Sequence, residues 1–279
     1  MTPPRAGEGT APAERVASLP MYDLPELRPH TDALWAALAR ALEARGVRGV
    51  PRALCRDRAL PSVWLGEDLL LSQTCGYPLV RALAGRVELV ATPRYAVPLC
   101  EGAWYRSRVV VPRGARAASL AELAGSICAV NEPDSHSGMN ALRAMVAPLA
   151  GGAPFFRRVV WTGAHLASLE LVARGEADVA AIDCVSFALF ERARHDLVAE
   201  VREIDVTPPC PGLPIITRAG SGEVGAMREA LADVAADPAL AATRAALLLD
   251  GFEVLPLAVY QRVDELEAEA ARLGYPDLA

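Results

Sequence analysis

The chain has 279 residues, of which 52% are hydrophobic, and its formal net charge at pH 7 is −6. This length exceeds one small domain and suits two α/β lobes with large cores. A nucleic-acid partner is disfavoured, because phosphate backbones require clustered Lys and Arg and the sequence has no basic run. No stretch of about 18 uninterrupted apolar residues occurs, so we expect no direct membrane insertion.

The N-terminus and the cysteines bear on the cellular compartment. Residues 1–14 are rich in Pro, Gly, Ala and charge, which favours a disordered tail, and they lack the basic and apolar regions of a signal peptide. Six scattered cysteines form no CxxC pair and no zinc-type spacing. We therefore expect buried thiols, no metal, no cofactor and, as the sequence is written, a cytoplasmic protein. A periplasmic protein is the alternative if a leader is missing.

Strands and helices alternate along nearly the whole chain. The apolar patterns predict strands at 16–19, 68–72, 87–90, 106–111, 126–131, 158–161, 177–182 and 213–217. Helices are predicted at 31–44, after residue 138, and at 164–174, 185–194 and 260–273. Such alternation indicates an α/β protein whose parallel sheets are covered by helices on both faces.

In sheets of this kind, ligands bind beyond the carboxyl ends of the strands. Five predicted strands end in small polar or aromatic side chains. The candidate ligand-binding residues at or near these ends are Tyr22, Gln73, Thr74, Tyr77, Ser135, His136, Ser137, Gly138, His165 and Asp183.

The segment from Asp134 to Gly138, between a predicted strand and an amphipathic helix, is the most informative of these. A helix start offers unpaired backbone N–H groups and partial positive charge, and it binds small anions readily. Ser135 and Ser137 would add hydroxyl donors, and Gly138 would let a ligand approach closely. The alternative is a plain helix cap formed by Asp134 or Ser135.

The remaining candidates also have two interpretations. His136 either lends positive charge when protonated or is a solvated, outward-facing side chain. His165 is expected to fix its loop by a hydrogen bond rather than to touch a ligand. Asp183 either contacts a ligand or caps the following helix. Tyr22 and Tyr77 offer a phenol, although Tyr77 precedes Pro78 and can simply begin a helix.

No catalytic residue is predicted. The sequence contains no G-x-S-x-G, HExxH, G-x-x-x-x-G-K-[ST] or G-x-G-x-x-G motif. We therefore expect a binding protein rather than an enzyme.

Two stretches carry a family resemblance. Residues 131–138, NEPDSHSG, resemble the N-D-P-x-S-x-S-G stretch of phosphonate-type substrate-binding proteins of ABC transporters. Residues 162–183 are similar to that family's G-x-H…V-x-x-G-x-x-D-V-A-x-x-D segment. The resemblance implies a type 2 periplasmic-binding fold, in which two lobes of mostly parallel sheets flanked by helices are joined by two crossing strands.

The resemblance also implies where the lobes and the ligand lie. The first lobe would comprise residues 15–104 and 211–279, the second 105–210, with crossing strands near 104–111 and 212–217. The cleft would close on a phosphonate, phosphate or phosphite by hinge motion. The oxyanion would lie at Ser135–Ser137, with Tyr22 and the Thr74 loop opposite and Asp183 closing the pocket.

The resemblance further implies an ABC permease as partner. Many members carry an acidic residue where this chain has Leu166, so a ligand ammonium group is disfavoured. Two alternatives remain. One is a cytoplasmic enzyme similar to those of the menaquinone pathway, with Asp183 or His136 as acid or base. The other is a stand-alone ligand-sensing module.

Overall fold

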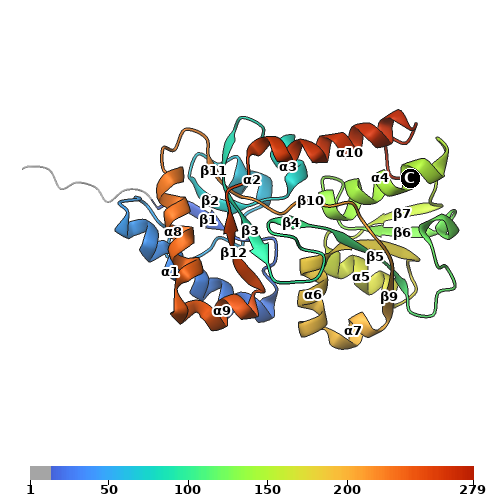
Figure 1. Ribbon diagram of the computed structural model, residues 1–279, viewed down its shortest axis with the longest axis horizontal. Helices are drawn as coiled ribbons and strands as arrows, with labels where there is room; N and C mark the ends of the chain where they lie inside the picture. The colour runs from blue at the N-terminus through green and yellow to red at the C-terminus, as the bar shows by residue number, and fades with distance from the viewer. Residues whose placement is uncertain (1–13) are drawn as a thin grey trace, which may run out of the picture.

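Two five-stranded sheets lie at opposite ends of an elongated molecule (Figure 1). The computed structural model describes residues 14–279, so all of the predicted tail except Glu14 lies outside the described residues. In spatial order, the first sheet contains β1 (Val16–Ser18), β2 (Leu69–Gln73), β11 (Ile215–Arg218), β3 (Val87–Tyr95) and β12 (Leu249–Glu253). The second contains β7 (Arg158–Trp161), β6 (Ile127–Val130), β8 (Val179–Asp183), β5 (Ser107–Pro112) and β9 (Val201–Val206).

A two-stranded ribbon lies between the sheets. Strand β4 (Trp104–Tyr105) pairs antiparallel with β10 (Cys210–Pro211). Strand β5 follows β4 into the second sheet, and β11 follows β10 into the first. The chain therefore crosses between the lobes twice, close to the positions that the sequence predicted for crossing strands.

The α/β class is confirmed, but the sheets are mixed rather than mostly parallel. Among the described residues, three of the eight strand pairings in the two five-stranded sheets are parallel. The crossing explains four of the five antiparallel pairings, all except that of β12 with β3. Strand β5 enters between β8 and β9 and runs antiparallel to both, and β11 does the same between β2 and β3. A strand that enters each sheet from the other lobe reverses the local direction.

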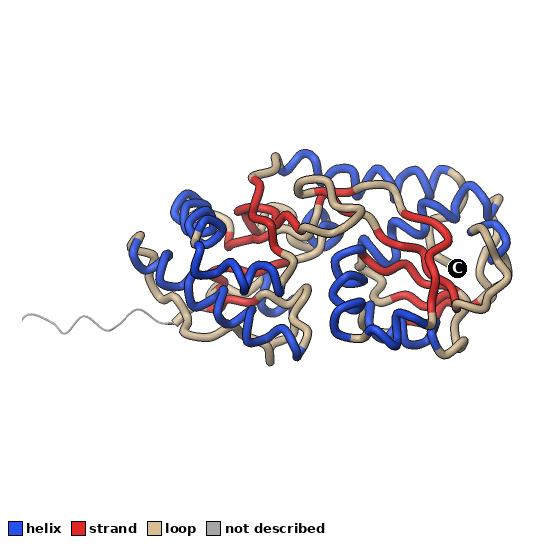
Figure 2. The backbone as a smooth tube through the Cα atoms, turned by 60° about the horizontal axis from the view of Figure 1, so that its bottom comes forward, coloured by secondary structure: helices blue, strands red, loops and turns tan. Residues whose placement is uncertain are grey.

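Helices flank both sheets (Figures 1 and 2). They are α1 (Arg28–Ala44), α2 (Leu60–Trp64), α3 (Gly76–Val80), α4 (Ala141–Ala150), α5 (His165–Ala173), α6 (Cys184–Ala193), α7 (His195–Ala199), α8 (Val224–Ala236), α9 (Ala241–Ala246) and α10 (Gln261–Arg272). Helix α1 shows why they form. Its apolar residues recur at helical spacing, and Leu34, Trp35 and Leu38 are buried against the first sheet. The Trp35 indole N–H donates to Pro51 O at 3.1 Å, so its burial leaves no polar group unpaired.

The last helix connects the two ends of the molecule. Helix α10 packs against both α3 and α4 (Figure 1). Ala270 in this helix, and Tyr275 and Leu278 after it, belong to the core of the second sheet. This end of the chain therefore packs against the second sheet, whereas the predicted boundaries assign all of 211–279 to the first lobe. The remaining lobe boundaries stay a prediction.

The ribbon between the lobes depends on a close backbone approach at Gly212. Its N–H donates to Ala103 O at 2.7 Å, and a Cβ there would lie 3.0 Å from that oxygen and 3.3 Å from Thr92 Cγ2. We expect Gly212→Ala to lower the free energy of unfolding by about 1–3 kcal/mol. The added methyl group would press on a backbone oxygen and on a buried threonine, and neither can move aside easily. Urea denaturation measures this change.

Gly225→Ala provides the matched control. A Cβ at Gly225, in the first turn of α8, meets nothing within 4 Å. The free energy of unfolding of this variant should stay the same or rise by up to about 1 kcal/mol. Equal stability of the two variants would contradict the packing argument for the ribbon.

Candidate functional site

The segment after β6 begins with a capped helical turn. The Ser135 side chain accepts a hydrogen bond from Gly138 N at 3.1 Å, and residues His136–Asn140 form a π-helical turn that leads into α4. The capping interpretation of Ser135 is therefore confirmed. Residues Ser135–Ser137 are nonetheless turned inward, and each is at most 6% exposed. The predicted anion site thus lies inside the protein rather than on its surface.

Gly138 has no room for a side chain. A Cβ there would lie 1.9 Å from Asn131 Oδ1 and 3.2 Å from His165 Cε1. Asn131 Oδ1 itself is buried without a hydrogen-bond partner among the described residues. The glycine therefore lets the end of β6, the helical turn and the start of α5 come together.

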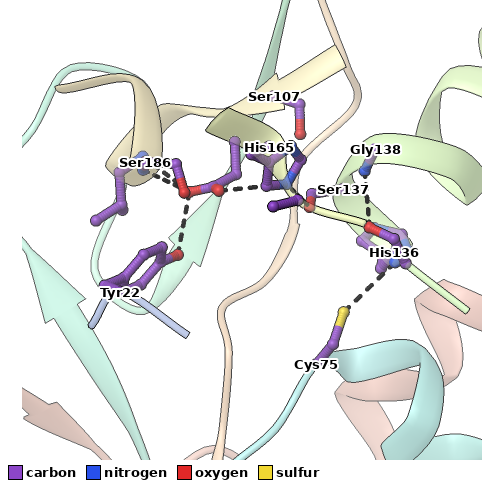
Figure 3. A network of polar contacts seen from close by, with 12 residues as sticks. Tyr22, Cys75, Ser107, His136, Ser137, Gly138, His165 and Ser186 are labelled. Atoms are coloured by element: carbon purple, nitrogen blue, oxygen red, sulfur yellow. Dashed lines mark hydrogen bonds and ion pairs between the residues drawn. The ribbon is translucent and has the colours of Figure 1, made fainter. Parts of the chain in front are cut away.

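Four predicted site residues form one continuous polar chain (Figure 3). The Tyr22 hydroxyl donates to Asp183 Oδ1 at 3.1 Å, and His165 Nε2 lies 3.4 Å from Asp183 Oδ2. The same Nε2 lies 2.8 Å from Ser137 Oγ. Tyr22 follows β1 of the first sheet and Asp183 ends β8 of the second, so the chain joins the two lobes.

Asp183 also caps α6. Its Oδ1 accepts the backbone N–H groups of Val185 at 3.0 Å and Ser186 at 2.9 Å. The carboxylate is only 2% exposed, so its charge depends on protein groups for stabilisation. These are the two N–H groups, the Tyr22 hydroxyl and the dipole at the start of α6. The cap interpretation of Asp183 is confirmed, and the same carboxylate takes part in the polar chain.

The Asp183 carboxylate determines the tautomer of His165. Burial lowers the pKa of His165, although the nearby Asp183 charge raises it, so the ring is neutral at pH 7. An unprotonated Nε2 would face a carboxylate oxygen lone pair at 3.4 Å, which is repulsive. We therefore assign the proton to Nε2, which donates to Ser137 Oγ at 2.8 Å with Asp183 Oδ2 3.4 Å away, and which leaves Nδ1 without a hydrogen-bond partner among the described residues. Ser137 Oγ is then an acceptor, and its own proton is directed to the neighbouring Tyr105 hydroxyl or to a ligand that replaces it.

The first sheet adds a second hydroxyl. Thr74, directly after β2, is fully buried, and its Oγ1 has no hydrogen-bond partner among the described residues. The next residue, Cys75, accepts a hydrogen bond from His136 N through its Sγ at 3.4 Å (Figure 3). The segment after β2 therefore meets the helical turn of the second lobe, one residue after Thr74.

Three other candidates have structural partners. Gln73 Nε2 donates to Leu213 O at 3.2 Å. Tyr77 lies against the second core, with the Arg81 guanidinium 5.6 Å from its ring centroid. His136 is 2% exposed, and its Nδ1 accepts from Asn140 Nδ2 at 3.2 Å.

Burial, together with the charges of Arg262 and Arg143, lowers the pKa of His136 to about 4. The lowered pKa favours a neutral ring at pH 7, and the burial of His136 contradicts the solvated, outward-facing interpretation. The helical turn at residues 136–140 therefore presents uncharged hydrogen-bond donors to the candidate site.

Sequence reasoning missed two residues that lie at this site. Ser107, on the crossing strand β5, is 1% exposed and is the register partner of Asp183 (Figure 3). A hydroxyl two positions before the apolar run 109–111 is a signal that could have identified it. Cys75 was expected to be only a buried apolar residue, and no sequence pattern marks its contact with the helical turn.

The family of the chain follows from residues 67–260, which match the model of the periplasmic substrate-binding protein of phosphonate ABC transporters. The chain belongs to this family. It is therefore a substrate-binding component of transport, not an enzyme, and it has the type 2 periplasmic-binding fold. In residues 14–279, no helix is long and apolar enough to cross a membrane.

Solved structures share the fold at low identity. The binding protein component of an ABC phosphonate transporter (PA3383) from Pseudomonas aeruginosa is 14% identical with a TM-score of 0.74, over 93% of this chain and 88% of that one. PhnD1 from Prochlorococcus marinus in complex with methylphosphonate has the same identity and TM-score, over 93% and 98%. XAC2383 from Xanthomonas citri bound to ATP is 17% identical with a TM-score of 0.69, over 92% and 97%. A search of curated proteins finds no match.

The buried His136 predicts a pH dependence of stability. Its pKa of about 4 in the folded protein lies below the ordinary value of 6.5, so the unfolded chain binds more protons between these pH values. Stability should therefore be lost as the pH falls from 6.5 to 4, by up to about 3 kcal/mol from this residue. Urea denaturation at several pH values measures the slope.

In His136→Gln, the loss of stability between pH 6.5 and pH 4 should be smaller than in the wild type, whatever the variant's absolute stability. His195 is exposed, so His195→Gln serves as the control and should keep the wild-type slope. An unchanged slope in His136→Gln would show that the imidazole is not held neutral.

Proposed function

We propose that the protein binds a small phosphorus oxyanion, of the phosphonate, phosphate or phosphite kind, between its two lobes. The observation that carries this proposal is the polar chain from Tyr22 through Asp183 and His165 to Ser137. It ends on the Ser137 hydroxyl, whose proton is available to Tyr105 or to a ligand, and the end of β2 adds the buried Thr74 hydroxyl, which has no partner among the described residues. Two neutral donors on opposite lobes suit a tetrahedral anion.

The helical turn supports the same ligand class. Its backbone N–H groups and helix dipole favour negative charge, and α4 continues the dipole for ten further residues. Ser135 Oγ already accepts the Gly138 N–H, so Ser135 shapes the turn. The proposal therefore assigns the direct contacts to Ser137, Thr74 and the turn's N–H groups, with Ser135 as support.

The charge balance is compatible with an anion. Asp183 is negative, but its Oδ1 receives three donors and its Oδ2 faces the His165 N–H. This carboxylate is thus largely neutralised by fixed dipoles. Two proteins of the same fold, PhnD1 with methylphosphonate and XAC2383 with ATP, bind ligands that contain phosphoryl or phosphonyl oxygens. These relatives support the ligand class.

The proposal includes a cleft that closes on its ligand. Contacts between Tyr22 and Asp183, and between Cys75 and His136, join the lobes in this structure. Both involve few atoms and lie on opposite sides of Ser137 in Figure 3, so a hinge at the β4–β10 ribbon would open the site. We further propose that the protein is periplasmic and passes its ligand to an ABC permease, because the family it belongs to does so.

Ser137→Ala tests the site. Removing a hydroxyl that donates to a charged ligand costs about 1.5–3 kcal/mol, so the affinity for methylphosphonate should fall roughly ten- to a hundredfold. Isothermal titration calorimetry measures the dissociation constant, and urea denaturation measures stability on the same variant. Ser119→Ala, which removes a half-buried serine outside the site, should leave the affinity unchanged. Unchanged affinity in Ser137→Ala would place the ligand elsewhere.

The selectivity of the site provides a second test. Leu166 occupies the position after His165 and packs against the core of the second sheet, so no acidic group is offered there to a ligand ammonium. We expect methylphosphonate to bind at least as tightly as 2-aminoethylphosphonate. Saturation at 100 times the dissociation constant should add roughly 2.7 kcal/mol of stability, which a thermal-shift assay detects. Much tighter binding of the amine would contradict the assignment.

A further inference from the structure

Two cysteines meet between the lobes. Cys100 Sγ and Cys184 Sγ lie 3.5 Å apart, although 84 positions separate them in the sequence. Cys100 is half-buried in the segment between β3 and β4, and Cys184 is the first residue of α6 and is buried. Both are free thiols.

Each sulfur is anchored to a different sheet. The segment that carries Cys100 is joined to the first lobe, because Ala96 N donates to Leu248 O at 2.9 Å, next to β12. Cys184 N donates to Arg106 O at 3.0 Å, beside β5 of the second sheet. A covalent bond between the two sulfurs would therefore tie the first lobe to the start of α6.

We infer that Cys100 and Cys184 are an oxidisable pair, which forms a disulfide that holds the two lobes together beside the ligand site. The sulfurs need to approach from 3.5 Å to about 2.0 Å, a movement within reach of side-chain rotation. Cys184 directly follows Asp183, which accepts the Tyr22 hydroxyl. The new bond would thus lie next to the hydrogen bond that already joins the lobes.

The chemistry requires an oxidant, for which we name a small-molecule disulfide. The half-buried Cys100 is the more accessible thiol. The hydrogen bond to Cys184 and burial raise the pKa of Cys100, so Cys100 passes its proton to the Cys184 sulfur as it attacks the oxidant, which gives a mixed disulfide and releases one small thiolate. Cys184 then gives this proton to the released thiolate, attacks the Cys100 sulfur, displaces the second small thiolate, which takes a proton from water, and leaves the protein disulfide. Two protein thiols are oxidised, and one oxidant disulfide is reduced to two thiols.

Cys184 is suited to the second step. A hydrogen bond with the Cys100 thiol lowers the pKa of Cys184, and the first turn of the ten-residue helix α6 favours a negative sulfur. Because the thiolate is the nucleophile in disulfide exchange, Cys184 is the resolving residue of the pair.

The test begins on the ligand-free, full-length protein. After incubation with oxidised glutathione, denaturation and alkylation, two of the six thiols should no longer react. Non-reducing peptide mapping should recover a peptide pair joined through Cys100 and Cys184. Cys100→Ser, at a half-buried position, should abolish this pair. Cys55→Ser is the matched control, because Cys55 is also half-buried but its thiol is directed to Asp57 Oδ1, and the pair should still form.

The second measurement uses bound methylphosphonate. Its dissociation rate, followed by stopped flow, should be at least tenfold slower in the oxidised protein than in the reduced protein, and dithiothreitol should restore it. Cys100→Ser should show no change with oxidation. Failure to recover the joined peptides, or equal dissociation rates before and after oxidation, overturns the inference. Peptide mapping needs no ligand, so it stands apart from a failure of methylphosphonate binding.

Discussion

The Asp183 carboxylate is the group on which the site depends. It caps α6 through two backbone N–H groups, accepts the Tyr22 hydroxyl from the other lobe and lies 3.4 Å from His165 Nε2. Burial of a charge costs free energy unless hydrogen-bond donors surround it. Here the donors also belong to a helix start and to the opposite lobe. One carboxylate therefore fixes a helix start, an interlobe contact and the tautomer of a histidine.

The tautomer of His165 determines whether the Ser137 hydroxyl donates to the ring or accepts from it. Because His165 donates, the serine proton points away from the ring, to the Tyr105 hydroxyl or to a ligand that replaces it. The site then offers neutral donors, whereas the cationic groups close to it are used elsewhere. Arg143, for example, is buried and donates to Asn140 Oδ1 and Pro276 O, each at 2.6 Å. Such a site would recognise an oxyanion by the direction of its hydrogen-bond donors rather than by a net positive charge.

Much of the fold was predictable because its signals are local. The apolar run 177–182 and the alternation around it gave strands close to those observed, and all eight predicted strands are present. Strand β9 was missed because Val201–Val206, VREIDV, carries three charged residues without strict alternation, and β12 was missed because Gly251, at φ +140°, interrupts it. The strand directions were not predictable, because they depend on how the chain crosses between lobes.

The candidate site was only partly predictable. The strand-end rule identified all four residues of the polar chain, since Asp183 ends β8, His165 begins α5, Tyr22 lies in the turn after β1 and Ser137 in the helical turn after β6. It also included Gln73 and Tyr77, because a sequence does not show which way a side chain points. The burial of His136 was unpredictable for the same reason. Its ring is enclosed by residues from distant segments, such as Tyr105, whose ring centroid lies 6.4 Å away.

Titration of methylphosphonate into Asp183→Asn shows whether Asp183 acts through the His165 tautomer or only through its charge. Asparagine also caps helices well, so α6 should remain intact. If Asp183 acts by fixing the His165 proton on Nε2, the amide no longer enforces that tautomer. Ser137 then donates to the ring, and affinity falls by about tenfold or more. If Asp183 were only a negative charge near the anion, its removal would strengthen binding. Equal or tighter binding would therefore contradict the account.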